Sequence, residues 1–260
     1  MPLAQAGDAH VYRFDTFPDN LIQHGVLSRT GGVSPAPWDS LNVGGTVGDD
    51  PPRVSENRLR AFRTLGLDPA SSHDVWQVHS ADIIVVDGPR GNAPLVQADG
   101  MVTRTPGVTL FMRFADCVPI LVVDPVRGAV GMAHAGWLGT VRATARQLVR
   151  TMVATFGSRP EDLLAGLGPS IAAHHYPIGP DVVAQLEASL GKAAAPHLSR
   201  RDGQTFFDLW SANRALLEDE GVRHVEVSGV CTACDLGLWY SHRAEHGHTG
   251  RLAALVSWVG

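Results

Sequence analysis

The chain has 260 residues, of which 44% are hydrophobic and 18% are charged, a balance that allows a sizeable core and excludes a disordered protein. Its net charge is −5 and it contains no basic run, which argues against nucleic acid as a partner. No stretch approaches the ~18–20 apolar residues of a membrane span. The start lacks a secretion signal, and the three cysteines do not form a disulfide framework. We therefore expect a cytoplasmic protein without a membrane partner.

The pattern of apolar residues predicts a mixture of strands and helices. An irregular stretch from Ser28 to Asp50 follows two β-like segments at 10–14 and 22–27. Asp50 and the two prolines after it predict the start of a helix that Gly66 ends. Further strands are expected at 75–79, 83–86, 108–114, 118–123, 129–133, 163–167, 205–209, 224–230 and 251–259. Further helices are expected at 141–156, 180–190 and 210–217, and a polar, mobile segment at 192–201. The sequence predicts one α/β domain over residues 1–260, with a mixed central β-sheet flanked by helices.

The stretch from Phe114 to Trp137 carries the first chemical signal, because each of two apolar runs lies beside a reactive side chain. Cys117 precedes the first run and His134 ends the second. A two-residue turn centred on Pro125 and Val126 would place Cys117 and His134 opposite each other, with Cβ atoms roughly 4.5–5.5 Å apart. At that separation they can share a metal ion or form a nucleophile–base pair.

His79, at the end of another expected strand, adds a third candidate ligand. Two histidines and one cysteine suit zinc, and catalytic zinc sites use three protein ligands. Asp99 or Asp116 could orient one of these ligands. Cys117 with His134 as its base is an equally good cysteine hydrolase pair. The spacings by themselves favour a third interpretation, a buried core thiol with unrelated histidines, because separations of 38 and 17 residues match no local metal motif.

Weaker candidates lie elsewhere in the chain. Ser28 and Arg29 open a glycine-containing loop that could bind phosphate. Cys231 and Cys234 cannot be half of a four-cysteine zinc site, because the chain has no second cysteine pair, so a coincidence at a strand end is the favoured interpretation. Two histidine groups are favoured as exposed polar residues rather than metal ligands: His174-His175 and His242, His246 and His248.

Several short motifs, in a fixed order, connect the chain to a known family. They are Ser28-Arg29-Thr30-Gly31-Gly32-Val33-Ser34, Ser40-Leu41-Asn42-Val43-Gly44, Gln77-Val78-His79, Ala98-Asp99-Gly100, Ala115-Asp116-Cys117-Val118-Pro119, His134-Ala135-Gly136-Trp137, Gly168-Pro169-Ser170-Ile171 and Thr249-Gly250-Arg251. With these motifs the chain resembles the YfiH-like laccase-domain proteins, formerly described as multicopper polyphenol oxidases and now as purine nucleoside phosphorylases with adenosine deaminase activity.

The resemblance implies one α/β domain, similar to that of a bacterial toxin deamidase. It implies a zinc ion, with copper as the alternative, held by His79, Cys117 and His134 as the catalytic centre. The implied substrates are inorganic phosphate and a purine nucleoside, namely adenosine, inosine, guanosine or methylthioadenosine. Candidate residues for substrate or phosphate are Ser28, Arg29, Asn42 and Arg243.

One departure from the family pattern concerns charge. The family has an arginine after the tryptophan of the His134–Trp137 motif, and this chain has Leu138. Arg142 or Arg113 could replace that arginine. Three rival functions stay open: a copper-dependent polyphenol oxidase, a metal-free cysteine hydrolase that uses Cys117 and His134, and a protein that binds nucleosides without turnover.

Overall fold

The structure, a computed structural model, describes residues 3–260, in which two mixed β-sheets pack face to face. The first sheet has the strand order β1 (Leu3–Ala6), β2 (Ala9–Tyr12), β3 (Ile22–Leu27), β15 (Leu252–Trp258), β7 (Thr109–Phe114) and β4 (Ser72–His73). The second has the order β14 (His224–Val227), β10 (Leu164–Leu167), β8 (Val118–Asp124), β9 (Ala129–Ala135), β6 (Gly100–Thr103) and β5 (Ile83–Val85).

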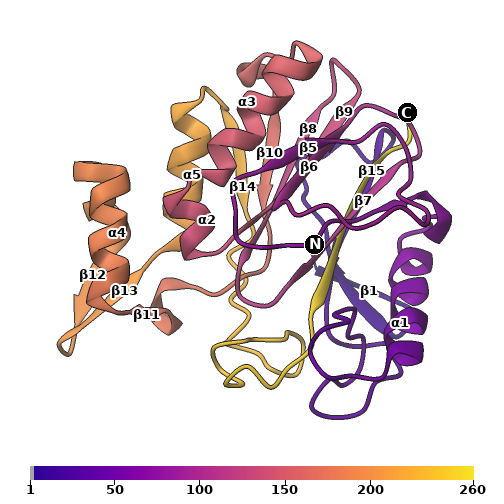
Figure 1. The fold of residues 1–260 in the computed structure, drawn as a ribbon, viewed down its shortest axis with the longest axis horizontal. Coiled ribbons are helices and arrows are strands. Elements are labelled where there is room, and N and C mark those ends of the chain that lie inside the picture. Colours follow the sequence, from indigo (N-terminus) through magenta and orange to yellow (C-terminus); the bar gives the residue numbers. More distant parts are fainter. Residues whose placement is uncertain (1–2) are drawn as a thin grey trace.

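Helices cover the outer face of each sheet, so the molecule has four layers (Figure 1). The helix α1 (Pro51–Thr64) packs on the first sheet, and α2 (Trp137–Val141), α3 (Thr144–Phe156) and α5 (Leu209–Asp219) pack on the second. Beyond them lie α4 (Pro180–Leu190) and a small sheet of β11 (Pro177–Ile178), β13 (Gln204–Phe207) and β12 (Leu198–Arg201) (Figure 1). No helix within residues 3–260 has the length and apolar character needed to cross a bilayer.

The side chains of the central strands explain this layering, because they alternate between the two faces of each sheet. On β8, Leu121 and Val123 face the core between the sheets, whereas Ile120 and Val122 face the helices. Because successive side chains of a strand point to opposite faces, a strand that is apolar on both faces must be buried on both. The mixed α/β architecture is confirmed, but the expected single central sheet is two sheets.

The β8–β9 hairpin corrects the expected turn. Asp124 pairs with Ala129, which leaves a four-residue loop, and Pro119 rather than Cys117 lies opposite His134. The longer loop forms because Asp124 Oδ1 accepts the N–H groups of Val126 and Arg127, and Gly128 adopts a φ of +64°. The register differs by two residues, so Cys117 and His134 keep the same face of the sheet.

Two other segments also differ from the expectation. Residues 75–79 do not form a strand: Trp76 makes one isolated bridge to Gln97, and His79 has a left-handed φ of 59°. Residues 192–201, expected to be mobile, form most of a short helix (Gly191–His197) and β12. The first outcome depends on Asp99, which holds the loop around His79, and the second on a hairpin between β12 and β13.

Candidate functional site

The structure brings His79, Cys117 and His134 together, with their potential ligand atoms all within 4.8 Å of one another. Cys117 immediately precedes β8, His134 lies on the neighbouring β9, and His79 lies in the loop after Trp76. His79 is exposed, Cys117 is half-buried and His134 is buried. The set therefore has one open side, and its two nitrogens and one sulfur are donors that both zinc and copper accept.

Asp99 orients two members of this set. Its Oδ1 lies 2.9 Å from Nδ1 of His134, which leaves Nε2 of that ring for a ligand. Its Oδ2 accepts the N–H groups of Val78 and Ser80, which flank His79. One buried carboxylate thus fixes both the His134 ring and the loop that carries His79, as expected for a partner of metal-binding histidines.

The thiol and the imidazole polarise each other. Burial by itself raises the pKa of Cys117, but the charge of His134 and hydrogen bonds from His134 and His79 lower it to about 6. Burial lowers the pKa of His134, but Cys117 and Asp99 raise it to about 9. Near neutral pH the pair therefore favours a thiolate beside an imidazolium, and the thiolate is the form of cysteine that binds metals or acts as a nucleophile.

Two neighbours of Cys117 shape its surroundings. A Cβ atom at Gly136 would lie only 2.6 Å from the Cys117 sulfur, so the missing side chain makes room for the thiol. Asp116 does not contact the histidines: its carboxylate accepts the Thr232 hydroxyl and the Arg243 backbone N–H. Of the two carboxylates expected to orient a ligand, Asp99 does so, and Asp116 instead joins the start of β8 to C-terminal loops.

The metal-ligand set opens into a cavity of about 550 Å³, within the range of roughly 300–1,000 Å³ typical of small-molecule sites. Its lining combines apolar and cationic side chains. Besides the three candidate ligands, the residues that line it include Gly44, Gly45, Arg58, Asp74, Trp76, Arg90, Leu95, Arg113, His242 and Arg251.

Positive charge exceeds negative charge in this cavity. Asp74 pairs with Arg90 at 2.6 Å and with Arg113 at 3.0 Å. Within residues 3–260, no carboxylate forms an ion pair with Arg58 or Arg251, which donate instead to backbone carbonyl groups. Burial lowers the pKa of both guanidinium groups, because it removes water from their charges. An anion bound beside them would offset part of this loss of hydration.

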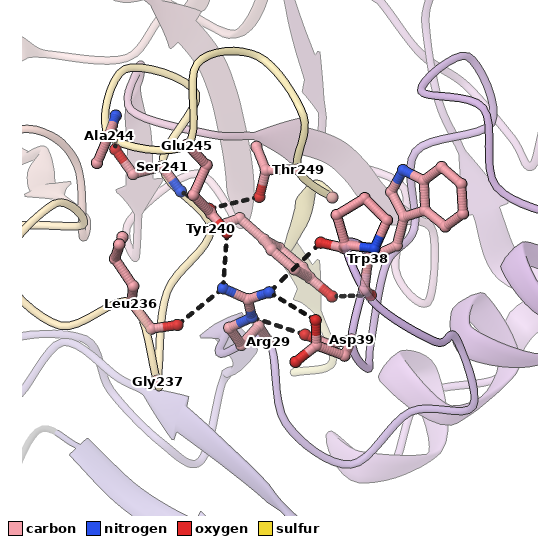
Figure 2. Close-up of polar contacts among 12 residues, drawn as sticks. Arg29, Trp38, Asp39, Leu236, Gly237, Tyr240, Ser241, Ala244, Glu245 and Thr249 are labelled. Atoms are coloured by element: carbon pink, nitrogen blue, oxygen red, sulfur yellow. Dashed lines mark hydrogen bonds and ion pairs between the residues drawn. The ribbon is translucent and has the colours of Figure 1, made fainter.

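Arg29 has a different role from the expected one, because it does not line the cavity and its guanidinium is held in a network of its own. It forms ion pairs with Asp39 at 3.1 Å and Glu245 at 3.0 Å, and it donates to the Leu236 carbonyl (Figure 2). It also stacks on the Tyr240 ring, 4.5 Å from the centroid. With 6% of its surface exposed and its donors occupied, Arg29 joins two loops rather than offering a phosphate site.

The other expected substrate residues also lie outside the cavity lining. Ser28 is buried and contacts Thr30. Asn42 is buried behind the wall, where its Oδ1 accepts the N–H groups of Gly44 and Arg251. Arg243 donates to the Pro177 carbonyl and stacks on a tyrosine. Asn42 therefore positions Gly44 and Arg251, which line the cavity, without lining it itself.

Arg113, one expected substitute for the arginine replaced by Leu138, lines the cavity. Arg142, the other, donates to the backbone carbonyl of His79 and so supports that loop. Of the three histidines near the C-terminus, only His242 lines the cavity, and none belongs to a metal-ligand group of the described chain. Arg58 was missed by sequence reasoning, because a polar residue on an amphipathic helix gives no sign of facing a cavity.

Known proteins resemble this chain in both sequence and structure. The family described as multi-copper polyphenol oxidoreductase laccase matches residues 23–259. A purine nucleoside phosphorylase from Deinococcus radiodurans is 40% identical over 92% of this chain and 90% of its own. The crystal structure of YlmD from Geobacillus stearothermophilus has a TM-score of 0.92 at 34% identity, covering 100% of this chain and 99% of that chain. YfiH of Bacillus licheniformis has a TM-score of 0.90 at 31% identity, covering 99% of each chain.

Proposed function

Since this chain belongs to the multi-copper polyphenol oxidoreductase laccase family, in which several relatives are named purine nucleoside phosphorylases, we propose that it is a zinc-dependent purine nucleoside phosphorylase. The substrates are adenosine, inosine, guanosine and methylthioadenosine, and adenosine deamination is a second activity. A phosphate oxygen bonds to C1′ as the bond from C1′ to the purine nitrogen breaks. The electron pair leaves with the purine, and ribose 1-phosphate forms.

The observation that carries this proposal is that the His79, Cys117 and His134 set shares one cavity with two guanidinium groups that have no carboxylate partner among the described residues. We assign phosphate binding to those groups, on Arg58 and Arg251. Arginine binds phosphate through paired N–H donors, and its charge offsets negative charge that develops on phosphate in the transition state. The Gly44–Gly45 segment beside them brings backbone close to the same anion.

An apolar wall suits the purine. Trp76 is 47% exposed and Leu95 is 37% exposed, although both are large apolar side chains, and both line the cavity. An aromatic face on which a base can stack contributes roughly 1–3 kcal/mol of binding per base. Trp76 is therefore our candidate for purine recognition.

The residues of the metal set would hold zinc, which supplies Lewis-acid polarisation when bound. Cys117 contributes a thiolate that its neighbours already stabilise near neutral pH. Asp99 accepts a hydrogen bond from Nδ1 of His134, which would leave the Nε2 lone pair of that ring available to the metal. His242, whose pKa is lowered by burial, is neutral near pH 7 and can exchange a proton with a substrate group at the cavity wall.

Copper-dependent phenol oxidation is the second candidate, because the family description names it. Two histidines and a cysteine are the ligand types of a blue-copper site. A multicopper enzyme needs several histidine-rich clusters, however, and the described residues contain only one other ligand group. A single three-ligand set beside an anion-binding wall supports phosphorolysis better. We further propose that residues 1–260 act as one domain in the cytoplasm.

The test is a product assay with inosine, with and without inorganic phosphate. Hypoxanthine and ribose 1-phosphate are expected in equal amounts, and only when phosphate is present. His79→Ala, Cys117→Ala and His134→Ala should each abolish most of the rate. Wild-type rates in all three variants would refute the site, and free ribose without phosphate would refute the reaction. Adenosine as substrate separates deamination, which yields inosine, from phosphorolysis, which yields adenine.

A further inference from the structure

A second group of metal-binding side chains lies outside the cavity lining. His174, His175, Cys231 and Cys234 offer four potential ligand atoms, all within 4.8 Å of one another. The two histidines lie in a short helical turn, Ala173–His175, and the two cysteines lie in a turn after β14. Sequence reasoning set each pair aside because neither pair makes a site alone, and the fold places them together.

The distances within this group fit a tetrahedral metal site. The His174 Nε2 to Cys234 Sγ distance is 3.1 Å, and His175 Nδ1 lies 3.5 Å from Cys231 Sγ and 3.6 Å from Cys234 Sγ. Zinc–sulfur and zinc–nitrogen bond lengths of about 2.3 and 2.0–2.1 Å give a sulfur–nitrogen edge of roughly 3.6 Å in a tetrahedron. The two His175 distances match this edge, and the His174 to Cys234 distance is about 0.5 Å shorter, which a small movement of the exposed His174 side chain would correct.

The backbone holds the two turns side by side. Ser170 forms a parallel bridge with Cys231, in which its N–H donates to the Val230 carbonyl and its carbonyl accepts the Thr232 N–H. The Ala172 N–H also points at the Cys231 sulfur, at 3.3 Å. These contacts hold the two turns together independently of any ion, so the backbone that carries the four ligands is preorganised.

We propose that His174, His175, Cys231 and Cys234 bind a structural zinc ion. Two nitrogens and two sulfurs in a tetrahedral arrangement are a typical structural zinc set, and four protein ligands leave no position for substrate. This inference does not depend on the function proposed above, because none of the four side chains lines the cavity.

The ion would support the catalytic centre through Asp116. Ile171, three residues before His174, donates its N–H to the Asp116 carbonyl. Thr232, next to Cys231, donates its hydroxyl to the Asp116 carboxylate at 2.7 Å. A zinc ion that links the two turns therefore links two of the hydrogen-bond partners of Asp116, the residue that precedes Cys117.

Zinc analysis of purified protein tests the proposal, with Cys117→Ser used to remove the contribution of the first site. We expect Cys117→Ser to retain one zinc per chain, as a closed four-ligand site predicts. Adding Cys234→Ser or His174→Ala to that variant should remove this zinc. Both positions are exposed, so folding should survive, which circular dichroism verifies. The matched control adds His224→Ala, an exposed histidine outside both groups, and should keep the zinc.

Cobalt substitution and thermal unfolding give readouts that do not depend on activity. Cobalt-loaded Cys117→Ser should show a thiolate-to-cobalt charge-transfer band that disappears when Cys234→Ser is added. A chelator should lower the Tm of Cys117→Ser but not that of the double variant. The proposal is overturned if Cys117→Ser holds no more zinc than the double variant. It is equally overturned if mass spectrometry of freshly alkylated protein shows a Cys231–Cys234 disulfide.

Discussion

At the scale of single residues, the positions of His79, Cys117 and His134 depend on small and buried neighbours. Asp99 positions His134 and the His79 loop at once, and the absent side chain of Gly136 gives the Cys117 sulfur its place. Sequence reasoning proposed the three candidate ligands, and a family resemblance favoured the metal over the free thiol. It could not foresee the role of Gly136, because the crowding arises from a hairpin register that local sequence did not fix.

Gly136→Ala should therefore weaken metal binding. The added Cβ atom would lie 2.6 Å from the Cys117 sulfur, so the thiol must move away from His79 and His134. We expect zinc affinity and kcat/KM to fall by about 10–100-fold, the usual effect of disturbing the residues that orient a metal ligand. Zinc titration against a competing chelator measures the first, and the inosine assay measures the second. Gly88→Ala is the matched control, since its Cβ atom meets nothing within 4 Å; equal zinc affinities for the two variants would contradict the account.

At the scale of elements, two arginines of similar sequence character have separate roles. Arg29 joins the loop at 37–39 to the loop at 236–249, which carries His242 into the cavity wall. Arg58 projects from α1 into the cavity. The sequence pointed to Arg29 because it lies beside a glycine pair, but loop composition does not indicate whether a side chain faces a cavity or another loop.

Arg29→Met should consequently lower stability, whereas Arg58→Met should weaken phosphate binding. Arg29→Met leaves Glu245 without its buried partner and should cost on the order of 3 kcal/mol of stability. Arg58→Met should leave the free energy of unfolding within about 1 kcal/mol of wild type and raise the KM for phosphate at least tenfold, because it removes a phosphate donor. Urea unfolding and phosphate titration distinguish them. If Arg29→Met, at a temperature where it remains folded, raised the phosphate KM as much as Arg58→Met, the assignment of the anion site would be incorrect.

The stability of the protein should depend on pH through His24, a residue of β3. His24 is 1% exposed and accepts the Phe14 N–H at 2.8 Å. Burial, assisted by the charge of Arg13, lowers the pKa of His24 to about 3. The unfolded chain binds this proton near pH 6.5, so stability is complete above that pH and declines as the pH falls towards 3. The expected loss from this residue at pH 5 is on the order of 2 kcal/mol.

His24→Gln should reduce that acid sensitivity, because glutamine can accept the Phe14 N–H without titrating. Urea unfolding at pH 7.5 and at pH 5 gives the difference for each protein. His224→Gln, at an exposed position on β14, should retain the wild-type difference. An equal difference in wild type and His24→Gln would show that this histidine does not control acid stability.

At the scale of the whole molecule, short-range features were predictable and long-range pairings were not. The bounds of α1 and α4 follow from prolines at their starts and glycines after their ends, which the sequence displays directly. The insertion of β15 between β3 and β7 joins segments more than a hundred residues apart, and so produces two facing sheets in place of one. The same long-range folding brings His174 and His175 to Cys231 and Cys234, two pairs that sequence reasoning had each discounted as a metal site.

We expect the His79, Cys117 and His134 set to make phosphorolysis depend on zinc. The most direct measurement follows ribose 1-phosphate by ³¹P NMR, with inosine and phosphate as reactants, in metal-free protein and in the same protein reloaded with zinc or with copper. Zinc should restore ribose 1-phosphate formation to wild-type protein but not to Cys117→Ser, and copper should not replace it. Equal formation by metal-free and zinc-loaded wild-type protein would contradict the claim.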